Sequence, residues 1–164
     1  MIIKIKSHTS NPIPQVYKLG DWIDLRAARD YTFQAPKINK KQIKFDIQKI
    51  SLGISMELPK GYEAWIAARS STFKEFGLIQ VNTPGIIDNS YNGNEDVWKF
   101  QVFSLRDTFI EKGDIICQFR IKLSQKASIW QKIKWLFSSK NIKFKIVDNL
   151  NNTNRGGFGT TGKN

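Results

Sequence analysis

Short runs of alternating apolar and polar residues recur along most of this chain. In Met1 to Lys6 the apolar side chains fall at alternate positions, as in a strand with one buried face. In Val97 to Leu105 the side chains of Trp98, Phe100 and Val102 likewise share a face. Similar runs occupy residues 43–50, 51–58, 64–68, 115–123 and 142–147, with turn-forming Pro, Gly and Asn residues between the earlier ones. Many short strands at this spacing predict an all-β sandwich or barrel.

Residues 128–138 depart from the strand pattern. Their spacing i, i+1, i+4, i+7, i+8 gathers the apolar residues on one helical face, away from two lysines. The apolar residues are Ile129, Trp130, Ile133, Leu136 and Phe137, and the lysines are Lys132 and Lys134. We expect a single β domain over residues 1–150, with a short amphipathic helix in an insertion at about 126–141. A mobile, Gly-rich arm over residues 151–164 should follow it.

Composition and charge fit one such domain. The chain has 164 residues, 40% of them apolar and 24% charged, which suffices for a core without disulfides. The single Cys117 lies in an apolar run, which favours a small buried thiol and a reducing, cytoplasmic compartment. No apolar stretch reaches the ~18 residues that span a bilayer, so we expect no membrane partner. The net charge of +12 favours anionic partners, although scattered lysines on a solvated surface explain it equally well.

The reactive side chains exclude several chemistries. The one histidine, His8, lies in a polar N-terminal stretch, so Ser-His or Cys-His catalysis and His-bound metals are not expected. The sequence has neither a Cys-x-x-Cys pair nor a Walker-type phosphate loop. Carboxylates, hydroxyls, arginines and Gly-rich backbone remain, and Mg²⁺-assisted phosphate chemistry uses these groups.

Two segments have the donors that phosphate binding needs. In residues 155–162, glycines let backbone N–H groups approach a ligand, while Arg155, Thr160 and Thr161 add donors. Phe158 in the same run is suited to stacking on a base. Residues 69–71, Arg-Ser-Ser, offer similar donors after an apolar strand, although a polar turn with a Ser cap would also explain them.

Three polar residues in other segments lie next to apolar residues in the sequence. Asp88 follows two isoleucines, where it could act as a base toward water or simply begin a turn. Asp24 follows an apolar pair of residues. Its carboxylate could lie near a metal ion, or it could simply cap a turn. Gln118 lies inside an apolar run, so its amide either joins a core network or faces a ligand.

Taken in order, residues 19–27, 68–72, 82–93, 113–119 and 155–162 resemble the five motifs of the trimeric dUTPase family. The match is closest in residues 85–93 and 155–162. The resemblance implies a jelly-roll, β-clip barrel and a homotrimer that hydrolyses dUTP to dUMP and pyrophosphate. The implied reaction is in-line attack of water on the α-phosphorus, with Mg²⁺ bridging the triphosphate. A phage origin would suit the compact size and the insertion.

The resemblance also implies roles for single residues. Asp88 would deprotonate the attacking water, Gln118 would help to hold that water, and Asp24 would join the water shell of Mg²⁺. Arg69, Ser70 and Ser71 would bind phosphates from a neighbouring subunit. Tyr91 would pack beneath the deoxyribose, while Asn82 and the hairpin backbone through Gly85 and Ile87 would pair with uracil. From the arm, Arg155 would reach the γ-phosphate, Phe158 would stack on uracil, and Gly159, Thr160 and Thr161 would close over the phosphates.

Some features depart from the family pattern and leave alternatives open. Asp21 and Trp22 replace the small residues usual before Asp24, which affects the expected metal site. The 128–138 helix either packs on its own trimer or docks another macromolecule through its tryptophans and lysines. A dCTP deaminase of the same fold is one rival, but the strand after residue 97 lacks the expected Glu. A regulatory binding protein acting through the insertion is another.

Overall fold

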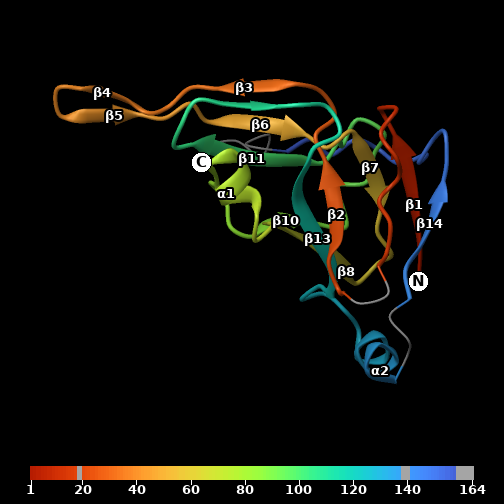
Figure 1. The fold of residues 1–164 in the computed structure, drawn as a ribbon. Coiled ribbons are helices and arrows are strands. Elements are labelled where there is room, and N and C mark those ends of the chain that lie inside the picture. Colours follow the sequence, from red (N-terminus) through yellow and green to blue (C-terminus); the bar gives the residue numbers. More distant parts are fainter. Residues whose placement is uncertain (18–19, 138–140, 158–164) are drawn as a thin grey trace.

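The computed structural model describes residues 1–17, 20–137 and 141–157, and most of its regular structure is β-strand (Figure 1). The strands are β1 Ile2–Ser7, β2 Ile23–Arg26, β3 Tyr31–Phe33, β4 Lys37–Asn39, β5 Gln42–Lys44, β6 Gln48–Ser51, β7 Ile54–Glu57, β8 Tyr62–Ala68, β9 Leu78–Gln80, β10 Gly85–Ile87, β11 Lys99–Ser104, β12 Thr108–Ile110, β13 Ile115–Leu123 and β14 Lys143–Ile146. Two short helices, α1 Thr72–Phe76 and α2 Ile129–Phe137, interrupt them. No helix in the described ranges is long and apolar enough to cross a membrane.

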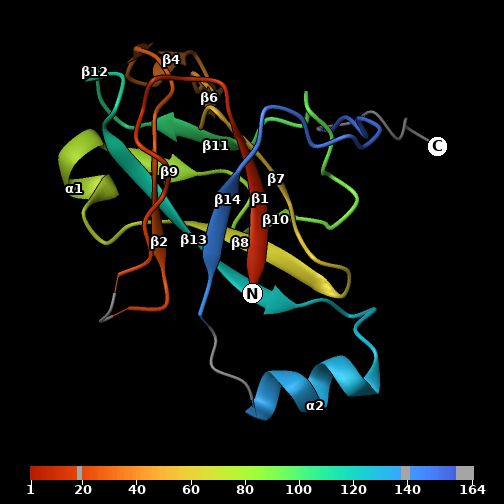
Figure 2. The same cartoon turned by 90° about the vertical axis from the view of Figure 1, so that its right-hand side faces the viewer.

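The strands form several small sheets that wrap around one core. The largest has the order β10-β8-β13-β2, and three-stranded sheets have the orders β14-β1-β7 and β6-β11-β9. β1 pairs parallel with β14 and antiparallel with β7, and Figure 2 shows β14 beside β1. Such small, mostly antiparallel sheets closing on a common core confirm the predicted all-β fold of the sandwich or barrel type.

Aromatic side chains join the sheets in the core. The rings of Trp98, before β11, and Phe119, on β13, meet edge to face at 5.2 Å between centroids. Phe119 also contacts Phe144 of β14 at 6.5 Å. Trp98, Phe100 and Val102 are at most 1% exposed, which confirms the face predicted from alternation. The polar residues between them are only half-buried, because successive side chains of a strand point to opposite faces.

Some predicted boundaries are wrong. The run at residues 43–50 divides into two strands, since β5 ends at Lys44 and β6 begins at Gln48. Within this run Phe45 contacts Phe103 at 4.6 Å between ring centroids. The strands β2, β3, β4, β9, β10 and β12 and the helix α1 lie where the alternation pattern predicted none, because they are three to five residues long and too short to repeat a pattern.

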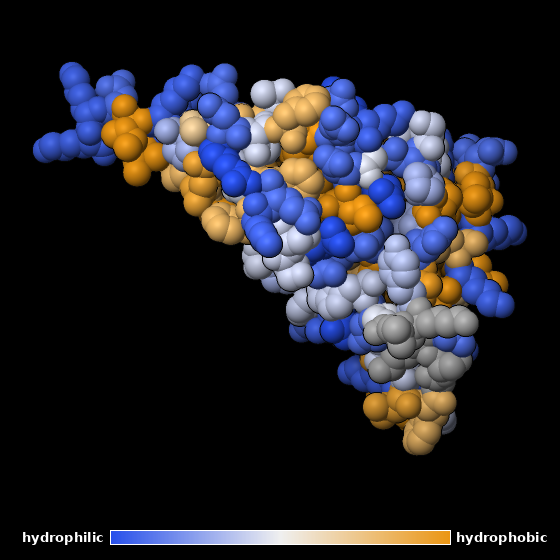
Figure 3. All heavy atoms as spheres, in the orientation of Figure 1, coloured by the Kyte–Doolittle hydropathy of each residue, from blue (hydrophilic) through white to orange (hydrophobic). Residues whose placement is uncertain are grey.

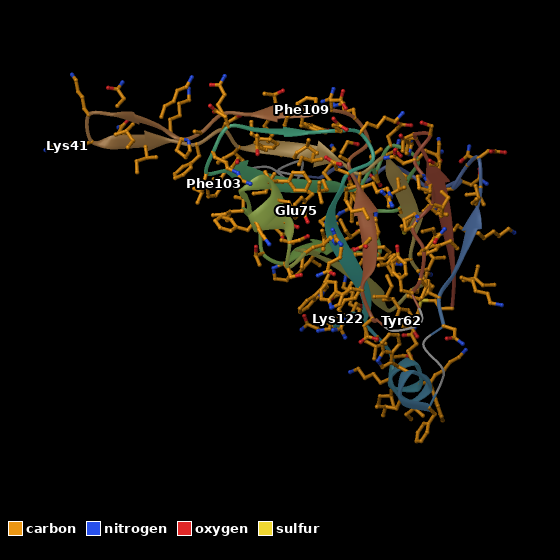
Figure 4. All side chains as sticks on the ribbon, viewed as in Figure 1. Lys41, Tyr62, Glu75, Phe103, Phe109 and Lys122 are labelled. Atoms are coloured by element: carbon orange, nitrogen blue, oxygen red, sulfur yellow. The ribbon has the colours of Figure 1, made fainter. Side chains whose placement is uncertain are left out.

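The hairpin β4–β5 projects from the body, with Lys41 at its tip (Figures 1 and 4). Its exposed isoleucines, Ile38 and Ile43, face each other across the pair. A two-stranded hairpin is at best marginally stable alone in water, so these apolar side chains favour a covering partner.

The predicted helix is present as α2 and lies at one end of the molecule (Figure 2). A capping box begins it: the N–H of Gln131 donates to Ser128 Oγ at 3.2 Å, and the N–H of Ser128 donates to Gln131 Oε1 at 2.7 Å. Gln131 also donates to the carbonyl of Lys60 at 2.6 Å. Trp135 packs on Tyr62 with ring centroids 5.5 Å apart, and Tyr62 lies next to the helix in Figure 4.

Candidate functional site

The central sheet brings Asp24, Arg69 and Gln118 together. Asp24 on β2 lies opposite Gln118 on β13, and Gln118 lies opposite Ala67 near the end of β8. Arg69, just beyond β8, forms an ion pair with Asp24, with Nε 3.1 Å from Oδ1. Gln118 Nε2 donates to the carbonyl of Ala68 at 3.3 Å. A half-buried cation, carboxylate and amide therefore meet near the end of β8, beside β13 and β2.

A turn after β8 fixes the backbone at Arg69. The N–H of Arg69 donates to Thr72 Oγ1 at 2.9 Å, and this hydroxyl donates to the carbonyl of Ile116 at 2.9 Å. Thr72 is fully buried. Ser71 occupies the N-cap position of α1, as the alternative of a polar turn with a Ser cap supposed, but its side chain makes no capping hydrogen bond. Ser70 is exposed. Sequence reasoning missed the role of Thr72, and only its place directly after the Arg-Ser-Ser segment could have indicated it.

The residues near Asp24 that depart from the family pattern contact Arg120, two residues beyond Gln118 on β13. Asp21 Oδ2 lies 3.7 Å from Arg120 Nη2. The guanidinium of Arg120 also lies over the ring of Trp22, 5.5 Å from its centroid. Cys117 is buried, as predicted, and burial followed by the charge of Asp24 raises the pKa of its thiol well above the ordinary value. The thiol is therefore protonated and unsuited to nucleophilic attack.

Asp88 follows β10 and is held by a tight turn. β10 pairs with β8, with Gly85 opposite Ile66. Asp88 Oδ1 accepts bonds from the N–H of Ser90 at 2.8 Å and from Ser90 Oγ at 2.5 Å. These two bonds lower the pKa of the Asp88 carboxyl, and the charges of Arg155 and Lys126 lower it further. The carboxylate is exposed in the single chain and is ionised at neutral pH.

Tyr91 lies under the beginning of the arm. Its side chain is 8% exposed, and its hydroxyl donates to the carbonyl of Val97 at 3.0 Å. Burial, with the charge of Asp96, raises the pKa of this hydroxyl. A Cβ added to Gly157 would lie 3.2 Å from Tyr91 Cε2, so the arm backbone runs against the ring.

Gln80 holds the turn that carries Asn82. Its Nε2 donates to the carbonyls of Ile66 at 3.1 Å and Asn82 at 3.0 Å. Its Oε1 accepts the N–H of Ala68 at 3.2 Å. Asn82 itself is exposed. Gln80 is a residue that sequence reasoning missed, and no signal in the sequence marks it. Phe158, Gly159, Thr160 and Thr161 lie outside the described residues.

The two groups of site residues lie far apart within one chain. β10 runs antiparallel to β8, so Asp88 lies one step past the Ile87–Ala64 pair and level with Glu63, whereas Gln118 is level with Ala67. Four residue steps along a strand separate them by about 13 Å, and two strand spacings add about 10 Å sideways. The cavity beside Asp24 has a volume of only ≈ 90 Å³, below the ~300–1,000 Å³ usual for ligand pockets.

A directly bound metal finds few ligands in the described part of the chain. No three His, Cys, Asp or Glu side chains gather there to hold an ion. Asp24 is a half-buried carboxylate beside Arg69. One carboxylate fits Mg²⁺ that keeps most of its waters and takes its other ligands from phosphates.

Comparison with known proteins gives a family match over most of the chain. The dUTPase family model matches residues 22–162. The SPbeta prophage-derived deoxyuridine 5′-triphosphate nucleotidohydrolase YosS of Bacillus subtilis is 45% identical over 164 residues, 99% of each chain. A deoxyuridine 5′-triphosphate nucleotidohydrolase of Finegoldia magna is 33% identical over 99% of each chain.

Solved structures share the fold at low sequence identity. The dUTPase from Streptococcus mutans superposes with a TM-score of 0.63 at 19% identity, covering 76% of this chain and 98% of its own. A mutant dUTPase from phage phi11 of S. aureus, whose structure shows a coordinated structural Mg(II) ion, gives 0.62 at 13% identity, with 77% and 94% covered. These likenesses bear out the predicted jelly-roll type of β fold.

Proposed function

This chain belongs to the dUTPase family and is a dUTP nucleotidohydrolase, and we propose that Asp88 is the base that activates water against the α-phosphorus, releasing dUMP and pyrophosphate. One observation carries the assignment of the base. Ser90 binds Oδ1 twice and lowers the pKa of the carboxyl, while Oδ2 accepts no hydrogen bond from any described residue. One oxygen is thus fixed, and the other is available to a water molecule.

A homotrimer would complete the site. Asp88 and Gln118 would both hold the attacking water, yet a single chain separates them by about 13 Å along β8 and by about 10 Å across the sheet. One water cannot contact both, so Asp24, Arg69 and Gln118 of one subunit would meet Asp88 and Tyr91 of another. The exposed isoleucines of the β4–β5 hairpin, 77% and 57% accessible, provide apolar surface for such an assembly.

The remaining side chains divide between the nucleoside and the phosphates. Arg69, Ser70 and Ser71 would donate to phosphate oxygens, since their turn is fixed by Thr72 and leaves Ser70 exposed. The buried ring of Tyr91 would support the deoxyribose. Asn82, with the backbone of Gly85 and Ile87, would pair with the uracil edge. From the arm, Arg155, Phe158, Gly159, Thr160 and Thr161 would close the site.

Mg²⁺ would be held through water by Asp24 and directly by the phosphates of dUTP. When bound, it would neutralise charge on the triphosphate and restrict it to one reactive conformer. Arg69 fixes the Asp24 carboxylate at 3.1 Å, so the chain orients this oxygen before the substrate arrives.

The substitution Asp88→Asn tests the base assignment. Asparagine keeps the size of the side chain but cannot take a proton, so we expect dUTP binding within about twofold of wild type and kcat lowered by about 10²–10⁴-fold. Glu111→Gln removes one negative charge from an exposed turn and should leave both constants unchanged. Nearly normal kcat in Asp88→Asn would refute the assignment. Pyrophosphate and ammonia release, assayed with dUTP and dCTP, separates hydrolysis from the deaminase alternative, which the named relatives do not favour.

A second role is proposed for α2, on a specific observation. Its apolar face points away from the body: Ile129, Trp130, Leu136 and Phe137 are each 73–86% exposed, and apolar spheres mark the helix in Figure 3. Gln131 and Trp135, on the opposite side, attach the helix to the domain. Lysines flank the exposed face on both sides, so the partner we propose is a protein with an apolar groove bordered by carboxylates.

The rival explanation for this face is a contact within the trimer, and two variants decide between them. Ile133→Glu and Leu136→Glu each place a charge on the face. If the face is free for a partner, both variants remain trimers with unchanged dUTP turnover in sedimentation and activity assays. Dissociation or lost turnover would assign the face to subunit packing instead.

A further inference from the structure

Asp96 is a buried carboxylate whose hydrogen bonds come from backbone amides. It is 1% exposed. Its Oδ2 accepts the N–H of Gly93 at 2.9 Å and that of Arg155 at 2.9 Å. Its Oδ1 accepts the N–H of Gly156 at 2.9 Å and shares that of Arg155 at 3.1 Å. Burying a carboxylate costs much free energy unless donors satisfy it, and here two of the three donors belong to the arm.

The contacts of the arm extend along one loop of the same chain. Residues 149–156 follow residues 92–96, mostly through exposed amide side chains. Asn94 donates to Asn149 Oδ1 at 2.7 Å, Leu150 donates to Asn94 Oδ1 at 3.0 Å, and Glu95 donates to Asn154 Oδ1 at 2.9 Å. Amide bonds of this kind compete with water, so each contributes little to holding the arm. Among these acceptors, Asp96 is the one that is both charged and buried. Its bonds to Arg155 and Gly156 are the most C-terminal hydrogen bonds of the arm in the described residues.

This attachment determines where the next residues of the arm lie. Arg155 is held by its N–H on Asp96, and its guanidinium charge acts on Asp88. Gly156 has a positive φ of 71°, which turns the backbone and which glycine adopts without strain. Gly157 then passes the ring of Tyr91. Asp96 thus connects the loop bearing Tyr91 to the part of the arm that faces the proposed base.

We propose that Asp96 is a positioning residue, which seats the C-terminal arm on the Tyr91 loop and so places Arg155 for the substrate phosphates. Its effect on catalysis rests on the proposed function, whereas the seating itself does not. Both carboxylate oxygens of Asp96 bind backbone N–H groups, so it would act through the arm backbone.

Asp96→Asn tests whether Asp96 holds the arm. Asparagine has the same shape, but its NH₂ group is a donor where the carboxylate has an acceptor oxygen, so it would face backbone N–H groups without accepting from them. Trypsin cleavage after Arg155, followed by mass spectrometry of the trimer, reports arm release without reference to activity. We expect cleavage at least about tenfold faster, because hydrogen bonds to a charged group are stronger than those between neutral groups. We also expect kcat/KM for dUTP to fall by about tenfold or more for the same reason.

Glu95→Gln is the matched control. It removes the same charge from the neighbouring residue, whose side chain is exposed and whose N–H bond to Asn154 is retained. Cleavage and kinetics should match wild type. Faster cleavage in this control equal to that in Asp96→Asn would overturn the proposal, because loss of charge alone would then explain both.

Gly93→Ala is a second, independent variant that leaves the carboxylate intact. A Cβ at this position would meet backbone atoms of Asn154 at 2.6 and 2.8 Å, so the arm must move away from the loop. We expect the same increase in cleavage after Arg155 and the same loss in kcat/KM. If both variants remain trypsin-resistant with normal kcat/KM, the proposal is wrong. If Asp88→Asn keeps a nearly normal kcat while cleavage in the Asp96 and Gly93 variants responds as expected, the proposed base assignment fails and the seating stands.

Discussion

Replacing Thr72 with valine should show how much one buried hydroxyl contributes to the site. Thr72 is fully buried, and its Oγ1 accepts the N–H of Arg69 and donates to the carbonyl of Ile116. Valine has nearly the same shape, so the packing is kept while both backbone groups lose their partner. Each unsatisfied buried group costs about 1–3 kcal/mol. Because Arg69 lies at a strand end, where water can partly replace the bond, we expect Thr72→Val to lower the free energy of unfolding by about 2–4 kcal/mol.

The matched variant is Thr72→Ser, which keeps the hydroxyl and removes one methyl group. Burial of a methyl contributes about 0.8 kcal/mol, so this variant should lose only about 1 kcal/mol. Urea unfolding at one fixed protein concentration measures both, because the stability of an oligomer depends on concentration. The turn also orients Arg69, so kcat/KM for dUTP should fall in the valine variant and stay near wild type in the serine variant. A larger loss of stability in Thr72→Ser than in Thr72→Val would refute this reasoning.

Three further changes are predicted to act on the site. Ser90→Ala removes the shortest hydrogen bond to Asp88, so the pKa of that carboxyl should rise toward its ordinary value. A carboxylate stops acting as a base when pH falls below its pKa. The acid limb of the plot of kcat/KM against pH should therefore move to higher pH. The same variant should be less stable than wild type at neutral pH and should lose less stability as pH falls, because a depressed carboxyl pKa stabilises the fold above the ordinary pKa and this stabilisation is lost as pH falls through the depressed pKa. Tyr91→Phe removes the bond to Val97 and should cost about 1 kcal/mol in urea unfolding. Gln80→Ala releases the turn at Asn82 and should raise KM for dUTP more than it lowers kcat.

The sequence predicted the long elements and the chemistry but not the short connections. β1, β8, β11 and β13 span six to nine residues, which is enough for alternation to be visible. The motif at Asp24 forms β2, and the motif before Asp88 forms β10, each only three or four residues long. Their strand character comes from pairing with β13 and β8, and such long-range pairing is not encoded in local pattern. The prediction of a mobile arm over residues 151–164 stays a prediction.

The positions of the site residues follow from this pairing rather than from their own types. Their apolar neighbours and the family resemblance marked Asp24, Arg69 and Gln118 as candidates, and the register of three strands places them side by side. The pairing of β10 with β8 places Asp88 four residue steps along β8 from the position level with Gln118. Neither of two groups of site residues this far apart would be sufficient for catalysis by itself. The dUTPase resemblance implies a site shared among subunits, and the strand register gives a physical reason for proposing it, since a second copy would present Asp88 to the water held by Gln118.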